Sequence, residues 1–324
     1  MNHFLVRRLL VLIPVFLGIT FLNFVLMNLL PGDAVDAMIN PRDSQRWTPE
    51  QIQARRVSLG LDKPWPVRYV VWLKELGKGN LGYSYFTKKP VTEELIARMG
   101  ATLKLQIVSF TVAIVFGIAL GVYSALRQYS FFDYQFTLFT YMGISIPTFF
   151  SALVIIYVFA VNLRWFPTSG LRVYGGESSI LDQLWYMALP TFTLAIGSWA
   201  TIMRFCRTSM LEVLQQDFLR TARAKGLANR SVILRHALRN ALLPVITVIG
   251  LSIPRLITGS ILVETVFDWP GMGQYSVLSI GRRDYPVLMG VTVIFSLAVL
   301  LSNLLTDIAY AVADPRIRYD QWHK

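Results

Sequence analysis

Residue types that carry enzyme or metal chemistry are scarce in this chain. Among its 324 residues are one cysteine, Cys206, and three histidines, so no internal disulfide and no multi-cysteine zinc or iron–sulfur site is possible. The sequence contains no G-x-x-x-x-G-K-[ST] phosphate loop, no H-E-x-x-H zinc motif and no G-x-S-x-G nucleophile motif. We therefore expect no catalytic residue, no metal site and no cofactor bound by this chain.

The most distinctive polar stretch runs from Asp217 to Gly226 and reads D-F-L-R-T-A-R-A-K-G. Asp217 is expected to N-cap a short helix, and Gly226 is expected to follow its C-cap. Arg220 and Arg223 are three residues apart and share a helix face. A slim basic helix of this kind can bind in a groove of a partner protein and transmit rigid-body motion. It can equally rest on the anionic headgroups of the membrane surface. The residues alone leave both interpretations open.

Three charged residues interrupt long apolar segments of the chain: Arg255, Glu264 and Asp307. A charge in the middle of a membrane costs at least a few kcal/mol, so such residues often mark a functional path. Arg255 either extends to the membrane surface or lines a substrate path, and Asp307 fits a paired structural carboxylate. These segments contain no histidine and no evident carboxylate pair, which argues against an ion-coupled carrier.

The overall composition places these residues in a membrane protein. Hydrophobic residues make up 54% of the chain and charged residues 15%, whereas soluble domains carry about 25% charged residues. The mean hydropathy is +0.49. This composition excludes intrinsic disorder and argues against an ordinary cytosolic enzyme. The net charge of +12 is compatible with nucleic-acid binding, so the positions of the charges must decide.

Six segments are long and apolar enough to cross a bilayer, which requires roughly 20 residues each. They cover residues 9–30, 105–126, 134–161, 185–203, 241–263 and 287–312, of which the fourth is the least apolar. The first is too long for a signal-peptide core and ends in Leu-Pro-Gly-Asp, so we expect an uncleaved anchor. Because a lone strand cannot satisfy its backbone in lipid, we predict an all-α integral membrane fold with six transmembrane helices.

Basic residues in the short connections set the orientation. Arg7 and Arg8 precede the first span, and residues 204–240 carry eight basic residues against two acidic ones. This pattern puts both termini in the cytoplasm. The positive net charge then reflects mostly basic residues on the cytoplasmic side of the membrane, so we do not expect nucleic-acid binding. The predicted parts are an anchor at 1–30, an outer segment at 31–100, a core at 101–312 with the cytoplasmic segment 204–240, and a tail at 313–324.

The outer segment carries local folding signals of its own. The sequence T-P-E-Q starting at Thr48 predicts a capped helix with proline in its first turn, and Gly60 is expected at its end. A second helix is expected from near Pro66 to before Gly77. Its aromatic side either lies among lipid headgroups or offers a docking surface to an outer partner; it consists of Trp65, Tyr69 and Trp72.

Small residues and prolines predict how the spans pack. The second span has a ridge of small residues four apart, Ala113, Gly117, Gly121 and Ala125, which lets another helix approach closely. Prolines lie inside or at the edge of several spans, and each is expected to invite a kink.

The chain resembles the membrane-spanning permease of bacterial ABC importers, in the dipeptide/oligopeptide/nickel group. Permeases of this class carry a cytoplasmic E-A-A motif followed by glycine and then Leu-Pro. Here residues 220–226 read R-T-A-R-A-K-G, and Leu243-Pro244 follow. The leading glutamate is replaced by Arg220 and the spacing to Pro244 is longer, but the peptide-permease branch shares both departures. Further matches at 79–84, 264–273 and 314–318 extend the resemblance over nearly the whole chain.

The resemblance implies the type I importer permease fold and a multi-pass protein of the bacterial inner membrane. It implies a second homologous permease, two ATPase subunits that bind ATP and Mg²⁺, and an outer substrate-binding protein. It also implies a coupling helix that contacts an ATPase through Asp217, Arg220, Thr221, Ala222, Arg223, Lys225 and Gly226. Glu264 to Pro286 and the outer segment are expected to meet the binding protein.

Two further expectations concern the path of the solute. The turn Trp269-Pro270-Gly271-Met272-Gly273 is predicted to gate the outer mouth, and Arg255 is a candidate for the translocation path. Peptides are the expected substrates. Nickel chelates, glutathione and oligosaccharides are alternatives within the family, and an ion-coupled carrier or a membrane enzyme is the alternative outside it.

Overall fold

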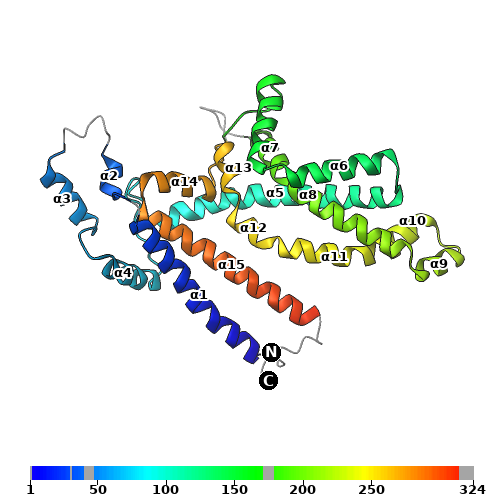
Figure 1. The fold of residues 1–324 in the computed structure, drawn as a ribbon, viewed down its shortest axis with the longest axis horizontal. Helices are drawn as coiled ribbons and strands as arrows, with labels where there is room; N and C mark the ends of the chain where they lie inside the picture. Colours follow the sequence, from blue (N-terminus) through cyan, green and yellow to red (C-terminus); the bar gives the residue numbers. More distant parts are fainter. Residues whose placement is uncertain (1, 30, 40–46, 171–178, 314–324) are drawn as a thin grey trace. The chain divides into compact units, whose positions relative to one another are not determined.

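The computed structural model describes residues 2–29, 31–39, 47–170 and 179–313, and the side chains of 2–9, 254, 255, 257 and 305–313 lie outside the description. Within these ranges the regular elements are helices, and one isolated β-bridge joins Tyr83 and Pro90. The all-α prediction is therefore confirmed. The elements group into two compact units, residues 1–101 with 271–324 and residues 102–270, and each is described by itself (Figure 1).

The first unit contains two long helices and several short ones. It comprises α1 (Asn2–Leu29), α2 (Ala34–Met38), α3 (Pro49–Ser58), α4 (Trp65–Gly77), the start of α5 (Val91–Leu126), α14 (Met272–Arg282) and α15 (Tyr285–Ala313). Helices α1 and α15 pack side by side, and α14 packs on both α15 and α2 (Figure 1). One of its apolar clusters joins Leu95 of α5 to Met272 of α14 and Val291 of α15.

The helices of the outer segment form as the sequence predicts. Thr48 accepts a hydrogen bond from the Gln51 backbone N–H, and the Gln51 side chain accepts one from the Thr48 N–H in return, which is a capping box. Gly60 follows the end of α3 with a φ of +68°, a conformation that glycine adopts without steric cost.

The aromatic side of α4 packs on α1 within the first unit. Tyr69 is 8% exposed, its ring lies 5.3 Å from those of Phe21 and Phe24, and its hydroxyl lies 3.0 Å from the Thr20 hydroxyl. Trp65, at the start of α4, is 44% exposed. The buried part of this surface is therefore occupied by the chain's own first helix rather than left open.

The second unit is built around α8 (Ile180–Leu214). It also contains the rest of α5, α6 (Phe131–Ser145), α7 (Thr148–Ile155), the π-helical turn η2 (Ile156–Asn162), α9 (Asp217–Ala224), α10 (Asn229–Ser231), the π-helical turn η3 (Val232–Ala237), α11 (Leu238–Leu251), α12 (Ile253–Thr258) and α13 (Ile261–Val266). Helices α6, α7, α11 and α13 pack on α8.

The predicted ridge of small residues lies at a close helix contact in this unit. A Cβ atom on Gly121 would lie 2.8 Å from Cys206 Cβ and 2.9 Å from the Met203 carbonyl oxygen. A Cβ atom on Gly117 would lie 2.8 Å from the Ile202 side chain. Real Cβ atoms do not approach other atoms so closely, so these glycines let α5 touch the backbone of α8. The packing role predicted for the ridge is confirmed.

The predicted third span is not one straight helix. Helices α6 and α7 meet at a bend of 112° around Ser145, Ile146 and Pro147. Ile146 is extended, with φ −82° and ψ 128°, because proline disfavours the helical conformation in the residue before it. Pro147 is the N-cap of α7, which begins at Thr148. The expectation of a continuous, tilted helix over 134–161 is corrected to a broken pair.

The predicted fifth span is also displaced. The apolar helix runs from Asn229 to Leu251 and includes a π-helical turn. Ser252 ends it just before Ile253-Pro254, and Gly259, with a φ of +69°, separates α12 from α13. The stretch predicted as one helix over 241–263 therefore consists of three helices.

The described residues contain four helices that are apolar and long enough to cross a membrane: Leu10–Leu29, Val91–Leu126, Asn229–Leu251 and Tyr285–Leu304. The broken pair brings the total to five if it counts as one span. Only 17% of the most apolar window of the first helix is buried, as expected for a surface that faces lipid or another subunit. Helix α8 is 35 residues long but more polar, so the count of six stays a prediction.

Candidate functional site

The basic segment forms the short helix α9, but its N-cap differs from the prediction. Gln216 occupies the N-cap position without a side-chain hydrogen bond, and Asp217 is the first helical residue. The Asp217 carboxylate instead accepts a hydrogen bond from Arg220 Nη1 at 3.3 Å. The N-cap therefore lies one residue earlier than predicted, at Gln216 instead of Asp217, and the negative charge of Asp217 in the first turn still favours the positive end of the helix.

The end of α9 agrees with the prediction. Gly226 has a φ of +76°, and its N–H donates to the Arg223 carbonyl at 2.9 Å. The Leu227 N–H donates to the Ala222 carbonyl at 3.4 Å, which closes the last turn. No heavy atom lies within 4 Å of a Cβ atom built on Gly226. The glycine is therefore required by the backbone conformation and not by crowding.

The two faces of α9 have opposite character. Leu219 is fully buried and Ala222 is 8% exposed, whereas Arg220, Thr221, Arg223 and Lys225 are exposed. The side chains of Arg220 and Asp217 are 76% and 90% exposed. Leu219 and Ala222 are three residues apart and therefore share the buried face of α9. Ala222 packs against the second unit on this face and does not lie on the exposed face.

Phe218 adds an apolar group to the exposed face, since its side chain is 43% exposed at the start of α9. An exposed aromatic ring among basic residues is typical of a protein-docking surface, where aromatic residues and arginine are enriched. Phe218 was not among the residues predicted to contact a partner. Its position next to the buried Leu219 was the signal that could have identified it.

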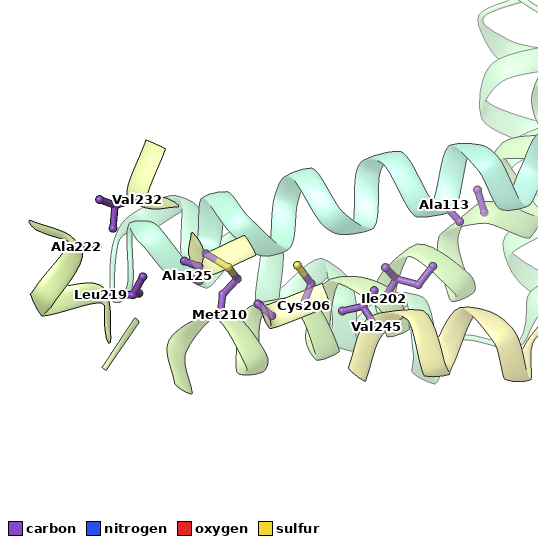
Figure 2. Packing of buried hydrophobic residues seen from close by; sticks show 12 residues of the cluster. Ala113, Ala125, Ile202, Cys206, Met210, Leu219, Ala222, Val232 and Val245 are labelled. Carbon is purple, nitrogen blue, oxygen red and sulfur yellow. The ribbon is translucent and has the colours of Figure 1, made fainter. Parts of the chain in front are cut away.

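An apolar cluster joins α9 to the helices of the second unit. Leu219 and Ala222 belong to the same cluster as Val232 of η3, Met210 and Cys206 of α8, and Ala125 of α5. Figure 2 shows this cluster extending from Ala113 past Cys206 to Leu219. Burying a leucine side chain stabilises a fold by about 1.5–3 kcal/mol, so this packing holds α9 on a firm base.

A buried ion pair reinforces that base. Asp133, 2% exposed, accepts hydrogen bonds from Arg207 Nε at 2.8 Å and Nη2 at 2.9 Å. Its carboxylate also accepts the Ser124 hydroxyl and the Tyr129 backbone N–H. This network ties the end of α5 and the start of α6 to α8. In the sequence alone, Arg207 is one of the eight basic residues of 204–240, with no sign of its buried partner.

The turn predicted as an outer gate is not an exposed turn. Trp269 is fully buried with Leu105 and Met187 in a cluster of the second unit. Met272 is fully buried in a cluster of the first unit. A role of residues 269–273 in gating stays a prediction, but neither of these side chains is available at a surface in this structure.

Arg255 lies in α12, and its side chain is outside the described residues, as is that of Asp307. The role of Arg255 in a solute path therefore stays a prediction. The basic tail residues Arg316, Arg318 and Lys324 also lie outside the described residues. The described residues contain no group of three or more histidine, cysteine or acidic side chains arranged to hold a metal ion.

Two family descriptions together match most of the chain. Residues 117–319 match the family described as "Binding-protein-dependent transport system inner membrane component". Residues 1–106 match the one described as "Binding-prot-dependent transport system membrane comp, N-term".

Similar proteins include peptide permeases over their full length. The oligopeptide transport system permease protein AppB of Bacillus subtilis is 45% identical over 320 residues, which cover 98% of this chain and all of AppB. The di/tripeptide transport system permease protein DppB of Pseudomonas aeruginosa is 39% identical over 339 residues, which cover 99% of this chain and all of DppB. Inward-facing structures of the MetNI methionine ABC transporter include a chain similar over 69% of this one and 97% of its own length, with a TM-score of 0.53 and 18% identity.

Proposed function

The chain belongs to the family of binding-protein-dependent transport system inner membrane components, and from this membership we propose that it is a permease subunit of an ATP-driven peptide importer. The observation that carries the choice of substrate is the identity to peptide permeases over the whole chain. The exposed basic face of α9 supports coupling to an ATPase. A nickel-chelate, glutathione or oligosaccharide substrate is the alternative outcome that the transport experiment would reveal.

In this proposal α9 is the coupling helix. Its outward groups contact an ATPase subunit, while Leu219 transmits the displacement to the cluster around α8. A ligand shifts a conformational equilibrium only through a difference in affinity between two states. The ATPase must therefore hold α9 differently before and after ATP closes it. ATP and Mg²⁺ bind to the partner subunits, and this chain supplies the path.

The remaining partners follow from the same proposal. A second homologous permease completes the path, and an outer binding protein delivers the solute to the side that carries residues 31–100. The bacterial inner membrane is the location, with both termini in the cytoplasm, as supported by the basic residues in the cytoplasmic connections. Lipid covers the exposed apolar faces that no subunit covers.

The first experiment is purification of the tagged chain from gently solubilised membranes, followed by reconstitution into liposomes. We expect a second permease and ATPase subunits to co-purify, and we expect ATP-dependent uptake of a labelled dipeptide in the presence of the binding protein. A chain that purifies alone without ATPase activity would contradict the importer proposal. Uptake of a nickel chelate without uptake of any peptide would contradict the choice of substrate only.

The second experiment separates coupling from folding. Gly226→Pro removes the N–H that binds the Arg223 carbonyl and imposes a φ near −65° where +76° is needed. Arg220→Glu with Arg223→Glu reverses the exposed charge. We expect both to abolish ATP-dependent uptake and release the ATPase while membrane insertion continues.

A matched control reverses two exposed arginines of the same segment that lie outside α9. Arg230→Glu with Arg239→Glu makes the same change of charge in α10 and α11, and we expect uptake to continue. Equal loss in both double variants would assign binding to general basic charge instead of α9. Normal uptake by the Arg220/Arg223 variant would reject the coupling role.

A further inference from the structure

A pocket of about 340 Å³ lies within the second unit between α5, α8 and the link from α12 to α13. Its lining combines two apolar side chains with amide, hydroxyl and backbone groups: Gln106, Ser109, Phe110, Leu194, Ser198, Gly259 and Ser260. None of the described lining residues carries a charged side chain. A volume of 340 Å³ is near the lower end of the range of about 300–1,000 Å³ that small-ligand pockets occupy.

Helix α5 contributes two polar side chains one turn apart. Gln106 is 8% exposed and Ser109 is 2% exposed. The Ser109 hydroxyl donates to the Leu105 carbonyl at 2.7 Å, which leaves its oxygen able to accept a hydrogen bond. A buried amide in a membrane-spanning helix is costly unless it faces a polar cavity. The placement of Gln106 in the pocket wall satisfies that condition.

Helix α8 contributes the hydroxyl of Ser198 to the lining. Ser198 lines the pocket, and Thr191 lies seven residues earlier on the same helix face. Thr191 is 8% exposed, and within the part of the chain that the structure describes its hydroxyl oxygen is buried without a hydrogen-bond partner. Thr191 does not line the pocket, so Ser198 is the polar side chain that α8 contributes to the described lining.

The third wall depends on a glycine. A Cβ atom on Gly259 would lie 2.6 Å from Glu264 Oε1 and 2.7 Å from Thr102 Cγ2, and the φ of +69° also favours glycine. The wall is therefore bare backbone at this point. Glu264 is fully buried behind it and accepts the Thr102 hydroxyl at 2.9 Å, so the carboxylate is satisfied away from the lining.

We propose that this pocket is a binding site on the translocation path for the backbone amides of the transported peptide. The inference rests on the proposed function and adds the contact that the peptide makes inside the permease. Amide and hydroxyl groups pair with the N–H and C=O that every peptide repeats. Because amide and hydroxyl groups are uncharged, these contacts do not select for or against charged side chains of the peptide. Selection among peptides is then left to the outer binding protein.

The test places a charge in the pocket without changing its shape. Gln106→Glu in the complete reconstituted transporter replaces an amide by a carboxylate of the same size. We expect the ratio of lysine-containing to aspartate-containing dipeptide uptake to rise at least about tenfold over that of the unmodified transporter, because the new charge attracts one cargo and repels the other. The matched control Gln183→Glu adds the same charge at the start of α8, beside Lys104 and outside the pocket. We expect it to leave the ratio unchanged.

A second variant keeps the proposal testable if Gln106→Glu fails to insert. Ser198→Leu fills part of the pocket with an apolar group, and we expect uptake of dileucine to fall more than uptake of diglycine while the ATPase still co-purifies. Uptake ratios unchanged in every variant that inserts would reject the pocket while peptide transport stands. Failure of the unmodified transporter to move any peptide would instead reject the proposed function.

Discussion

Helix α9 and the turn at 269–273 both contain or adjoin residues that favour turns, such as glycine and proline. In the structure, however, the side chains of α9 are largely exposed, whereas Trp269 and Met272 in the turn are buried. In α9, Gly226 ends a helix whose Arg220 stays 76% exposed. In the second segment, Pro270 and Gly271 join two parts of the chain in which Trp269 and Met272 are fully buried. Turn residues predict where the backbone bends. The neighbouring side chains decide whether the bend is exposed or buried. Arginine keeps the end of α9 exposed, and tryptophan buries the turn at 269–273.

The largest expected effect is on the buried side of this comparison. Trp269→Ala removes a fully buried indole from its contacts with Leu105 and Met187, and we expect a loss of about 3–5 kcal/mol in the free energy of unfolding. Equilibrium unfolding of the purified chain in mixed micelles measures it. A loss below about 1 kcal/mol, with uptake abolished, would instead support the predicted gate.

A smaller effect is expected where the backbone alone is under constraint. Gly226→Ala meets no neighbouring atom but must keep a φ of +76°, which costs about 1–2 kcal/mol for a residue with a Cβ atom. We expect reduced ATPase retention together with a modest loss of stability. Gly226→Asn, which tolerates this conformation better, should recover part of both. No difference between alanine and asparagine would show that backbone strain is not the cause.

The smallest effect on stability is expected on the exposed side. Phe218→Ala removes a ring that is 43% exposed, and exposed substitutions usually change stability by less than about 0.5 kcal/mol. We nevertheless expect the variant to retain less ATPase on purification, because the ring lies on the exposed face of α9 that we propose contacts the ATPase. If Phe218→Ala lowered the unfolding temperature as much as Trp269→Ala does, the conclusion that α9 is exposed and the 269–273 turn is buried would be wrong.

Local signals in the sequence predicted local structure well. The capping box of Thr48 and Gln51 and the glycine ends at Gly60 and Gly226 form as expected, because each depends on a few neighbouring residues. The ridge at Gly117 and Gly121 also packs as expected, because a close helix contact needs small residues wherever it occurs.

Features that depend on distant residues were not predictable in the same way. The 112° bend at Pro147 requires packing partners for both arms, and hydropathy alone describes one long apolar run. The pocket residues Gln106, Ser109 and Ser198 were not predicted, because uncharged polar side chains within a span carry no local pattern that marks a shared pocket. The buried pair of Asp133 and Arg207 joins residues 74 positions apart, which no local pattern reveals.

The close contact of α5 with α8 has a practical consequence for labelling. Cys206, the chain's only cysteine, is fully buried against Gly121, and its thiol lies 3.7 Å from the Ile118 carbonyl. Thiol reagents in water should therefore leave the unmodified chain almost untouched. A single cysteine introduced at the exposed Thr221 would carry a spin label or fluorophore with little background. A labelled Thr221→Cys variant can thus report conformational changes without replacement of the native Cys206.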